Sequence, residues 1–163
     1  MIVPDRARST PVRAVSASTE GFGDIDAPID AVWAVLMDVE RYPEWNPFTV
    51  SVKTTFDLGS PVDMQVALNP SSGRTRHQVE YITSFHPERY RVSWGVNVGP
   101  GWFIKADRWQ QLTDLGNGRT RYETSDEFTG AGVGLMLAIM ESKVSRGFHD
   151  VARGLKTRAE SLT

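Results

Sequence analysis

Residues 134–163 carry apolar side chains at the spacing of one long helix. On a wheel of about 3.6 residues per turn they form a single stripe, and most charged side chains point away from it. The stripe consists of Leu137, Met140, Val144, Phe148, Val151, Leu155 and Leu162. Leu135, Met136 and Ile139 widen the apolar arc in the first half, whereas the second half keeps a narrow stripe suited to tight packing. Because no other predicted helix is as long, a broad flat element must cover this stripe.

In most of the remaining chain, apolar and polar residues alternate with the two-residue period of strands. A weak strand over 13–25 precedes a short helix over 28–38, and Pro43 and Pro47 allow at most one further helical turn. From residue 48 to 128, alternation and turn residues predict six hairpin-linked strands. The order predicts an α+β fold: a curved antiparallel sheet of seven strands wrapped around the C-terminal helix, with two short helices at one end. Such a sheet rarely closes on one helix without leaving a hollow, where apolar ligands bind.

Length and composition restrict the possible functions. With 163 residues we expect one domain over 14–163, preceded by a disordered leader over 1–13. A net charge of -2 without a long basic run argues against nucleic acid as a partner. The absence of cysteine excludes thiol chemistry and cysteine-ligated metals, and three scattered histidines do not form a metal site. No signal peptide or transmembrane run is evident, so we expect a cytoplasmic protein, either a monomer or a homodimer.

Several short motifs resemble those of one family. They are Ala27-Pro28-x-x-x-Val32-Trp33, Tyr42-Pro43-x-Trp45-Asn46-Pro47, Gly118-x-Thr120-Arg121, Asp126-Glu127-Phe128-x-Gly130 and Gly147-Phe148. Over about residues 14–162 this pattern resembles the START-like superfamily, in its bacterial polyketide cyclase/dehydrase-type branch. The resemblance implies the helix-grip fold and a deep hydrophobic cavity for lipids, sterols, polyketides or aromatic metabolites. It implies no shared catalytic residues, because the superfamily includes enzymes, carriers and resistance proteins.

Polar residues on faces predicted to look inward are the candidates for chemistry. His77 lies beside Val79 on an apolar strand face and is either an acid/base group or, as we favour, a hydrogen-bonded core or rim residue. By parity Asp126 points inward, with Arg108 on the neighbouring strand as its expected partner; the pair either polarises a carbonyl or, as we favour, only neutralises itself. Glu141 is a further candidate, although a carboxylate at the edge of the stripe reaches solvent more readily.

Aromatic and aliphatic residues on the inward faces are the candidates for ligand binding, although a packed core uses the same residue types. The candidate set is Trp33, Val66, Val79, Tyr81, Trp94, Trp102, Met136, Met140 and Val144. We expect the cavity under the first half of the long helix, with Asp126 and Glu141 near the mouth, and His77 and Trp94 deeper. The glycine-rich segment 130–134 is expected to bound the entrance.

Three classes of function remain. The first is a binder of a small hydrophobic ligand, a lipid, polyketide or aromatic metabolite, without any cofactor. The second is a polyketide cyclase or dehydratase that uses interior acid/base groups. The third is an interaction protein, which requires an exposed apolar patch. No nucleotide-binding loop or serine-hydrolase motif is present, so nucleotide-dependent and serine-hydrolase chemistry are excluded.

Overall fold

The computed structural model of the protein describes the backbone of residues 15–163 and the side chains of residues 20–69 and 71–163. The leader predicted over 1–13 lies outside the described residues. The elements follow the predicted order: β1 (Val15–Ile25), α1 (Ile29–Met37), η1 (Val39–Arg41), α2 (Tyr42–Trp45), β2 (Thr49–Lys53), β3 (Pro61–Asn69), η2 (Pro70–Ser72), β4 (Arg74–His86), η3 (Pro87–Arg89), β5 (Arg91–Val98), β6 (Ile104–Gly116), β7 (Arg119–Gly130) and α3 (Val133–Glu160).

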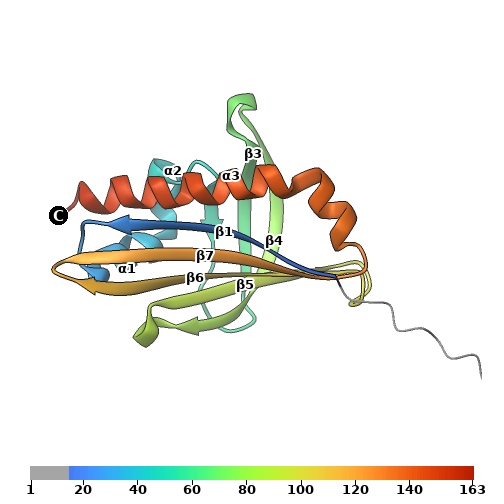
Figure 1. The fold of residues 1–163 in the computed structure, drawn as a ribbon, viewed down its shortest axis with the longest axis horizontal. Helices are drawn as coiled ribbons and strands as arrows, with labels where there is room; N and C mark the ends of the chain where they lie inside the picture. Colours follow the sequence, from blue (N-terminus) through green and yellow to red (C-terminus); the bar gives the residue numbers. More distant parts are fainter. Residues whose placement is uncertain (1–14) are drawn as a thin grey trace, which may run out of the picture.

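All strands within residues 15–163 belong to one antiparallel sheet of seven strands, in the order β1-β7-β6-β5-β4-β3-β2. Figure 1 shows α3 running along the concave side of this curled sheet, with α1 and α2 near the C-terminal end of the helix. Register shifts interrupt the ladders between Thr49 and Ser51, and between Ile82 and Ser84. Such bulges bend a strand and increase its twist, which helps the sheet to curl around the helix. The predicted helix-grip fold is therefore confirmed.

The second half of α3 packs between β1 and the segment 45–48. Phe148, Val151 and Leu155 are each at most 1% exposed and belong to the core. Two glycines allow the close approach: a Cβ on Gly147 would lie 2.2 Å from the ring of Phe48, and one on Gly154 would lie 2.1 Å from the carbonyl oxygen of Trp45. Side chains at these positions would collide, so glycine permits the packing.

The first half of α3 is packed differently. In the segment 133–146 only Val133 is buried, while Leu135 and Ile139 are 70% and 63% exposed. The side chains on its inner face lie over a cavity instead of a packed sheet. None of the helices within residues 15–163 has the length and apolar character needed to cross a membrane.

Candidate functional site

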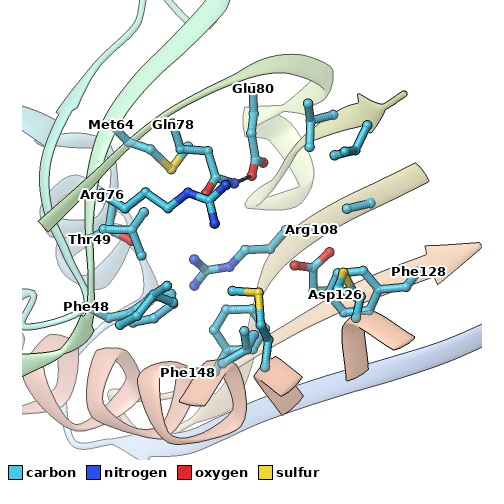
Figure 2. Close-up of a pocket in the computed structure, with 18 of the residues that line it drawn as sticks. Phe48, Thr49, Met64, Arg76, Gln78, Glu80, Arg108, Asp126, Phe128 and Phe148 are labelled. Atoms are coloured by element: carbon cyan, nitrogen blue, oxygen red, sulfur yellow. Dashed lines mark hydrogen bonds between the residues drawn. The ribbon is translucent and has the colours of Figure 1, made fainter. Parts of the chain in front are cut away.

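A cavity of about 410 Å³ lies between the sheet and the first half of α3. This volume is within the range of small-molecule sites. Figure 2 shows side chains from several strands pointing into it. Its lining consists of Phe48, Thr49, Met64, Val66, Leu68, Arg76, His77, Gln78, Glu80, Trp94, Val96, Val98, Ile104, Ala106, Arg108, Asp126, Phe128, Met136, Leu137, Met140, Glu141, Val144 and Phe148. The location under the first half of the helix agrees with the sequence prediction.

The exposed members of the lining mark where the cavity opens. Arg76 and His77 come from the start of β4, Val98 from the end of β5 and Glu141 from α3, and all four are exposed. The mouth is therefore formed by these two strand ends and the helix. No residue of 130–134 lines the cavity, so the predicted glycine-rich entrance is wrong. The reason is packing: Gly132 donates a hydrogen bond to the carbonyl of Phe103 (2.8 Å), and a Cβ on Gly132 would lie 2.8 Å from the Phe103 ring.

Arg108 lies at the buried inner end of the cavity, where it is only 7% exposed. Among the described side chains, its guanidinium forms one hydrogen bond, from Nε to Oγ1 of Thr124, at 3.1 Å. The guanidinium carbon lies 4.2 Å from the centre of the Phe148 ring and 6.0 Å from that of Trp94. These cation–π contacts partly compensate for lost water, but a guanidinium has five N–H donors, and most of them face the cavity unused.

Asp126 is paired with Arg108 in the β6–β7 ladder, so both side chains emerge on the same face. The expected ion pair between them is nevertheless not formed within the described chain, because no Arg108–carboxylate contact lies within 4.0 Å. In Figure 2 the Arg108 guanidinium extends toward Phe48 and Thr49, away from the Asp126 carboxylate. The prediction of direct neutralisation is therefore wrong: the stacking of Arg108 on Phe148 draws the guanidinium away from its cross-strand neighbour.

Two carboxyl groups face the cavity in an environment that favours their neutral form. Burial and, second to it, the charge of Asp126 raise the pKa of Glu80 from 4.5 to about 7, against the lowering effects of a hydrogen bond from Gln78 and the positive charge of Arg108. Burial likewise raises the pKa of Asp126 from 3.8 to about 7, and Arg108 opposes this rise. Near neutral pH both groups exchange protons readily, a property of acid/base residues.

Two buried oxygen atoms near this end have no hydrogen-bond partner among the described residues. They are Oγ1 of Thr49 and Oδ1 of Asp126. Buried polar atoms are nearly always paired, with protein, water or ligand. Together with the unused N–H groups of Arg108, they make the inner end of the cavity a polar pocket inside an otherwise apolar site.

The sequence profile of the family described as polyketide cyclase / dehydrase and lipid transport matches residues 15–160. The chain belongs to this family. The expectation of a START-like member from the polyketide cyclase/dehydrase-type branch is thereby confirmed. No curated protein sequence matches the chain significantly.

Several solved structures share the fold. The Zhui aromatase/cyclase from Streptomyces sp. R1128 superposes with a TM-score of 0.71 at 19% identity, covering 90% of this chain and 94% of that one. A START superfamily protein from Mycobacterium smegmatis gives 0.63 at 19% identity, covering 92% and 99%. Norcoclaurine synthase from Thalictrum flavum, in complex with dopamine and hydroxybenzaldehyde, gives 0.70 at 13% identity, covering 100% and 97%. At such low identity these similarities establish the fold alone.

Five of the residues expected to bind ligand line the cavity of this family member, namely Val66, Trp94, Met136, Met140 and Val144. The chemical candidates Arg108, Asp126 and Glu141 line it too, with Arg108 buried and Glu141 exposed at the mouth. His77 also lies at the mouth rather than deep inside, where its Nε2 and Oδ1 of Asp63 are 3.0 Å apart. Of the two interpretations of His77, the structure agrees with a hydrogen-bonded rim residue.

Four candidates are placed away from the cavity, so their predicted orientation is wrong. On β4, Val79 and Tyr81 point to the convex face, and Tyr81 is 51% exposed. Trp102 is 67% exposed in the β5–β6 turn, before regular strand alternation begins. Trp33 is half-buried near the other end of the fold, where its ring packs on Phe85 and Tyr90.

The sequence prediction missed the polar cavity residues of β4 because it assigned the wrong face of this strand to the interior. Alternation on this strand places Arg76, Gln78 and Glu80 inside, although they belong to its more polar face. The signal that identifies them is Ile82, which shares their parity and is only 2% exposed. Thr49 was missed because the bulge between Thr49 and Ser51 turns both Thr49 and Val52 inward.

The described residues contain no group of three or more histidine, cysteine, aspartate or glutamate side chains arranged to hold a metal ion. The side chains of the site offer hydrogen bonds from Arg108 and proton transfer through Glu80 and Asp126.

Proposed function

We propose that this protein binds a small hydrophobic molecule in the cavity under α3, with an oxygen-bearing end of the ligand directed at Arg108. The observation that carries the proposal is the asymmetry of the cavity. Its walls are apolar, from Leu68, Phe128 and Met140 among others, while its inner end holds a buried guanidinium with unused donors. A buried charge needs acceptors, and neither nearby carboxyl supplies them as an ion pair.

The chemistry of the inner end indicates the class of ligand. A ketone, phenol, enol or carboxylate oxygen can accept hydrogen bonds from Arg108 and, when protonated, can donate to Oδ1 of Asp126. The apolar walls suit an aromatic polyketide or a lipid chain. Binding of aromatic compounds by norcoclaurine synthase, a neighbour in fold, is compatible with this choice.

Thermal denaturation with matched ligands tests the proposal. A hydroxylated anthraquinone and a long-chain fatty acid are compared with hydrocarbons of the same size that lack oxygen. A ligand present at about 100 times its dissociation constant stabilises the folded state by roughly 2.7 kcal/mol. We expect a rise in Tm with an oxygenated ligand, and about 10- to 100-fold weaker binding of that ligand by Arg108→Met, since a hydrogen bond to a charged group contributes about 1.5–3 kcal/mol. If no oxygenated ligand shifts the Tm, the proposal is wrong.

A second function is favoured by a specific observation, the two cavity carboxyls with raised pKa. In an aldol cyclisation, one ionised carboxyl removes a proton from the carbon between two ketones, and the enolate attacks a second carbonyl. This new C–C bond closes the ring, and the alkoxide that forms, stabilised by Arg108, takes a proton from the other, neutral carboxyl. The resulting hydroxyl then leaves together with a proton from the adjacent carbon, so that one water is lost and a C=C bond forms in the ring. Glu80 and Asp126 are the residues for these two roles.

Turnover of a poly-β-ketone analogue by the parent and by Glu80→Gln and Asp126→Asn distinguishes binder from enzyme. Removal of a general acid or base lowers kcat by about 10²- to 10⁴-fold. If both variants turn over the analogue at the parental rate, Glu80 and Asp126 do not perform the chemistry.

A further inference from the structure

Large apolar side chains are exposed on one side of the cavity mouth. Val98, Trp102, Leu135 and Ile139 are 47%, 67%, 70% and 63% exposed. We call these four residues the rim patch. Half of the exposed large hydrophobic side chains in the described chain belong to it.

The members of the rim patch come from two segments that are joined by hydrogen bonds. The backbone N–H of Ala131 donates to the carbonyl of Trp102 (3.1 Å), which holds the β5–β6 turn against the entry of α3. Leu135 and Ile139 follow in the first turns of α3, four residues apart and therefore on one face. Val98 pairs with Ile104 and also lines the cavity, so the patch continues into the mouth.

The charge around the patch is positive, although the whole chain carries a net charge of -2. Segments 97–105 and 131–147 contain three cationic residues, Lys105, Lys143 and Arg146, against one acidic residue, Glu141. Lys143 continues the exposed line of Leu135 and Ile139 along α3. An apolar surface with a tryptophan, flanked by Lys and Arg, has the composition of segments that lie in the interface of an anionic bilayer.

We propose that the rim patch docks the protein reversibly on an anionic lipid surface, with the cavity mouth against the membrane. Leu135, Ile139 and Trp102 enter the headgroup region while Lys105, Lys143 and Arg146 contact lipid phosphates. A second copy of the chain is a poorer occupant, because a two-fold contact through the same patch brings the cations of both copies together. A role in ligand uptake from the membrane rests on the proposed function, whereas the docking itself does not.

Co-sedimentation of the full chain with vesicles tests the docking. The vesicles are phosphatidylcholine alone, or phosphatidylcholine mixed with phosphatidylglycerol. We expect binding to the anionic vesicles that weakens as salt rises, and at least about tenfold weaker partitioning for the double variant L135Q/I139Q, because burial of apolar side chains drives insertion. The double variant K143E/R146E should lose the preference for anionic vesicles.

Leu58→Gln is the matched control. Leu58 is 77% exposed but lies in the β2–β3 turn, so its replacement should leave vesicle binding unchanged. The proposal is overturned if the parent binds neither vesicle, or if L135Q/I139Q partitions like the parent. A concentration-dependent dimer that L135Q/I139Q dissociates, without vesicle binding by the parent, also overturns it and assigns the patch to self-association.

Ligand binding in the absence of lipid separates this proposal from the previous one. Leu135 and Ile139 do not line the cavity. L135Q/I139Q should therefore bind an oxygenated ligand like the parent does. If L135Q/I139Q loses vesicle binding but still binds the ligand, the rim patch acts in docking alone. If the parent binds vesicles but no ligand, only the proposed cavity function is refuted.

Discussion

The two halves of α3 are parts of one continuous helix but have opposite surroundings. In the second half Phe148, Val151 and Leu155 are buried, and glycines bring the helix backbone against Phe48 and Trp45. In the first half Met136 and Met140 face a cavity, while Leu135 and Ile139 face solvent. The helix therefore has two roles: one half anchors the fold, and the other covers the cavity.

The largest expected contrast is in core packing. Phe148→Ala should lower the free energy of unfolding by about 3–5 kcal/mol, because it removes a buried ring that packs on Phe48 and Arg108. Ile139→Ala, also on α3 but 63% exposed, should change it by no more than about 0.5 kcal/mol. Chemical denaturation of both variants measures the difference. Equal losses would mean that the two halves are packed alike.

A pair of glycine substitutions should shift stability in opposite directions. Gly154→Ala places a methyl group where the Trp45 carbonyl oxygen is 2.1 Å away and should destabilise by about 1–3 kcal/mol. Gly134→Ala meets no atom within 4 Å and should stabilise by about 0.4–1 kcal/mol, because alanine restricts the unfolded chain. Thermal melting of the two variants is the check. A lower Tm for Gly134→Ala would show that the first half tolerates added bulk no better than the second.

The two buried carboxyl groups in the cavity predict that the stability of the protein depends on pH. The pKa values of Glu80 and Asp126 are raised on folding from 4.5 and 3.8 to about 7, so the folded chain holds these protons more tightly than the unfolded chain. Their contribution to stability is therefore complete below the unfolded values and is lost as pH rises through about 7. Between about pH 5 and pH 8 the free energy of unfolding of the parent should fall more steeply than that of Asp126→Asn.

Urea denaturation at several pH values measures this difference. The carboxyls of Asp24 and Glu160, whose pKa values are lowered by hydrogen bonds from Arg121 and Lys156, stay ionised over this range and do not obscure it. Identical slopes for parent and variant would show that Asp126 is not protonated more readily in the folded state.

The fold could be predicted from the sequence because its signals are long and local. The period of α3, the hairpin turns and the spacing of apolar residues on β3 and β5 each extend over many residues, so one irregular position does not change the result. The prediction of a cavity under the first half of α3 followed from the width of its apolar arc, which no facing strand fills.

The polar end of the site could not be predicted in full, for physical reasons. Because side chains alternate along a strand, one choice of which residues face inward fixes the orientation of all of them. On β4 the more apolar set of alternate residues lies on the convex face. Bulges, such as the one beside Thr49, shift the phase without a clear sequence mark. The partner of Arg108 depended on competition between the Asp126 carboxylate and the Phe148 ring, which spacing along the chain does not reveal.

The central claim is that the cavity under the first half of α3 binds a hydrophobic ligand, and two adjacent residues test it most directly. Met140 lines the cavity, whereas Ile139 faces solvent. Calorimetric titration with an oxygenated ligand that stabilises the parent should show at least about tenfold weaker binding by Met140→Trp, since the indole fills the space of the ligand, and parental binding by Ile139→Trp. Parental affinity in a folded Met140→Trp variant would contradict the account.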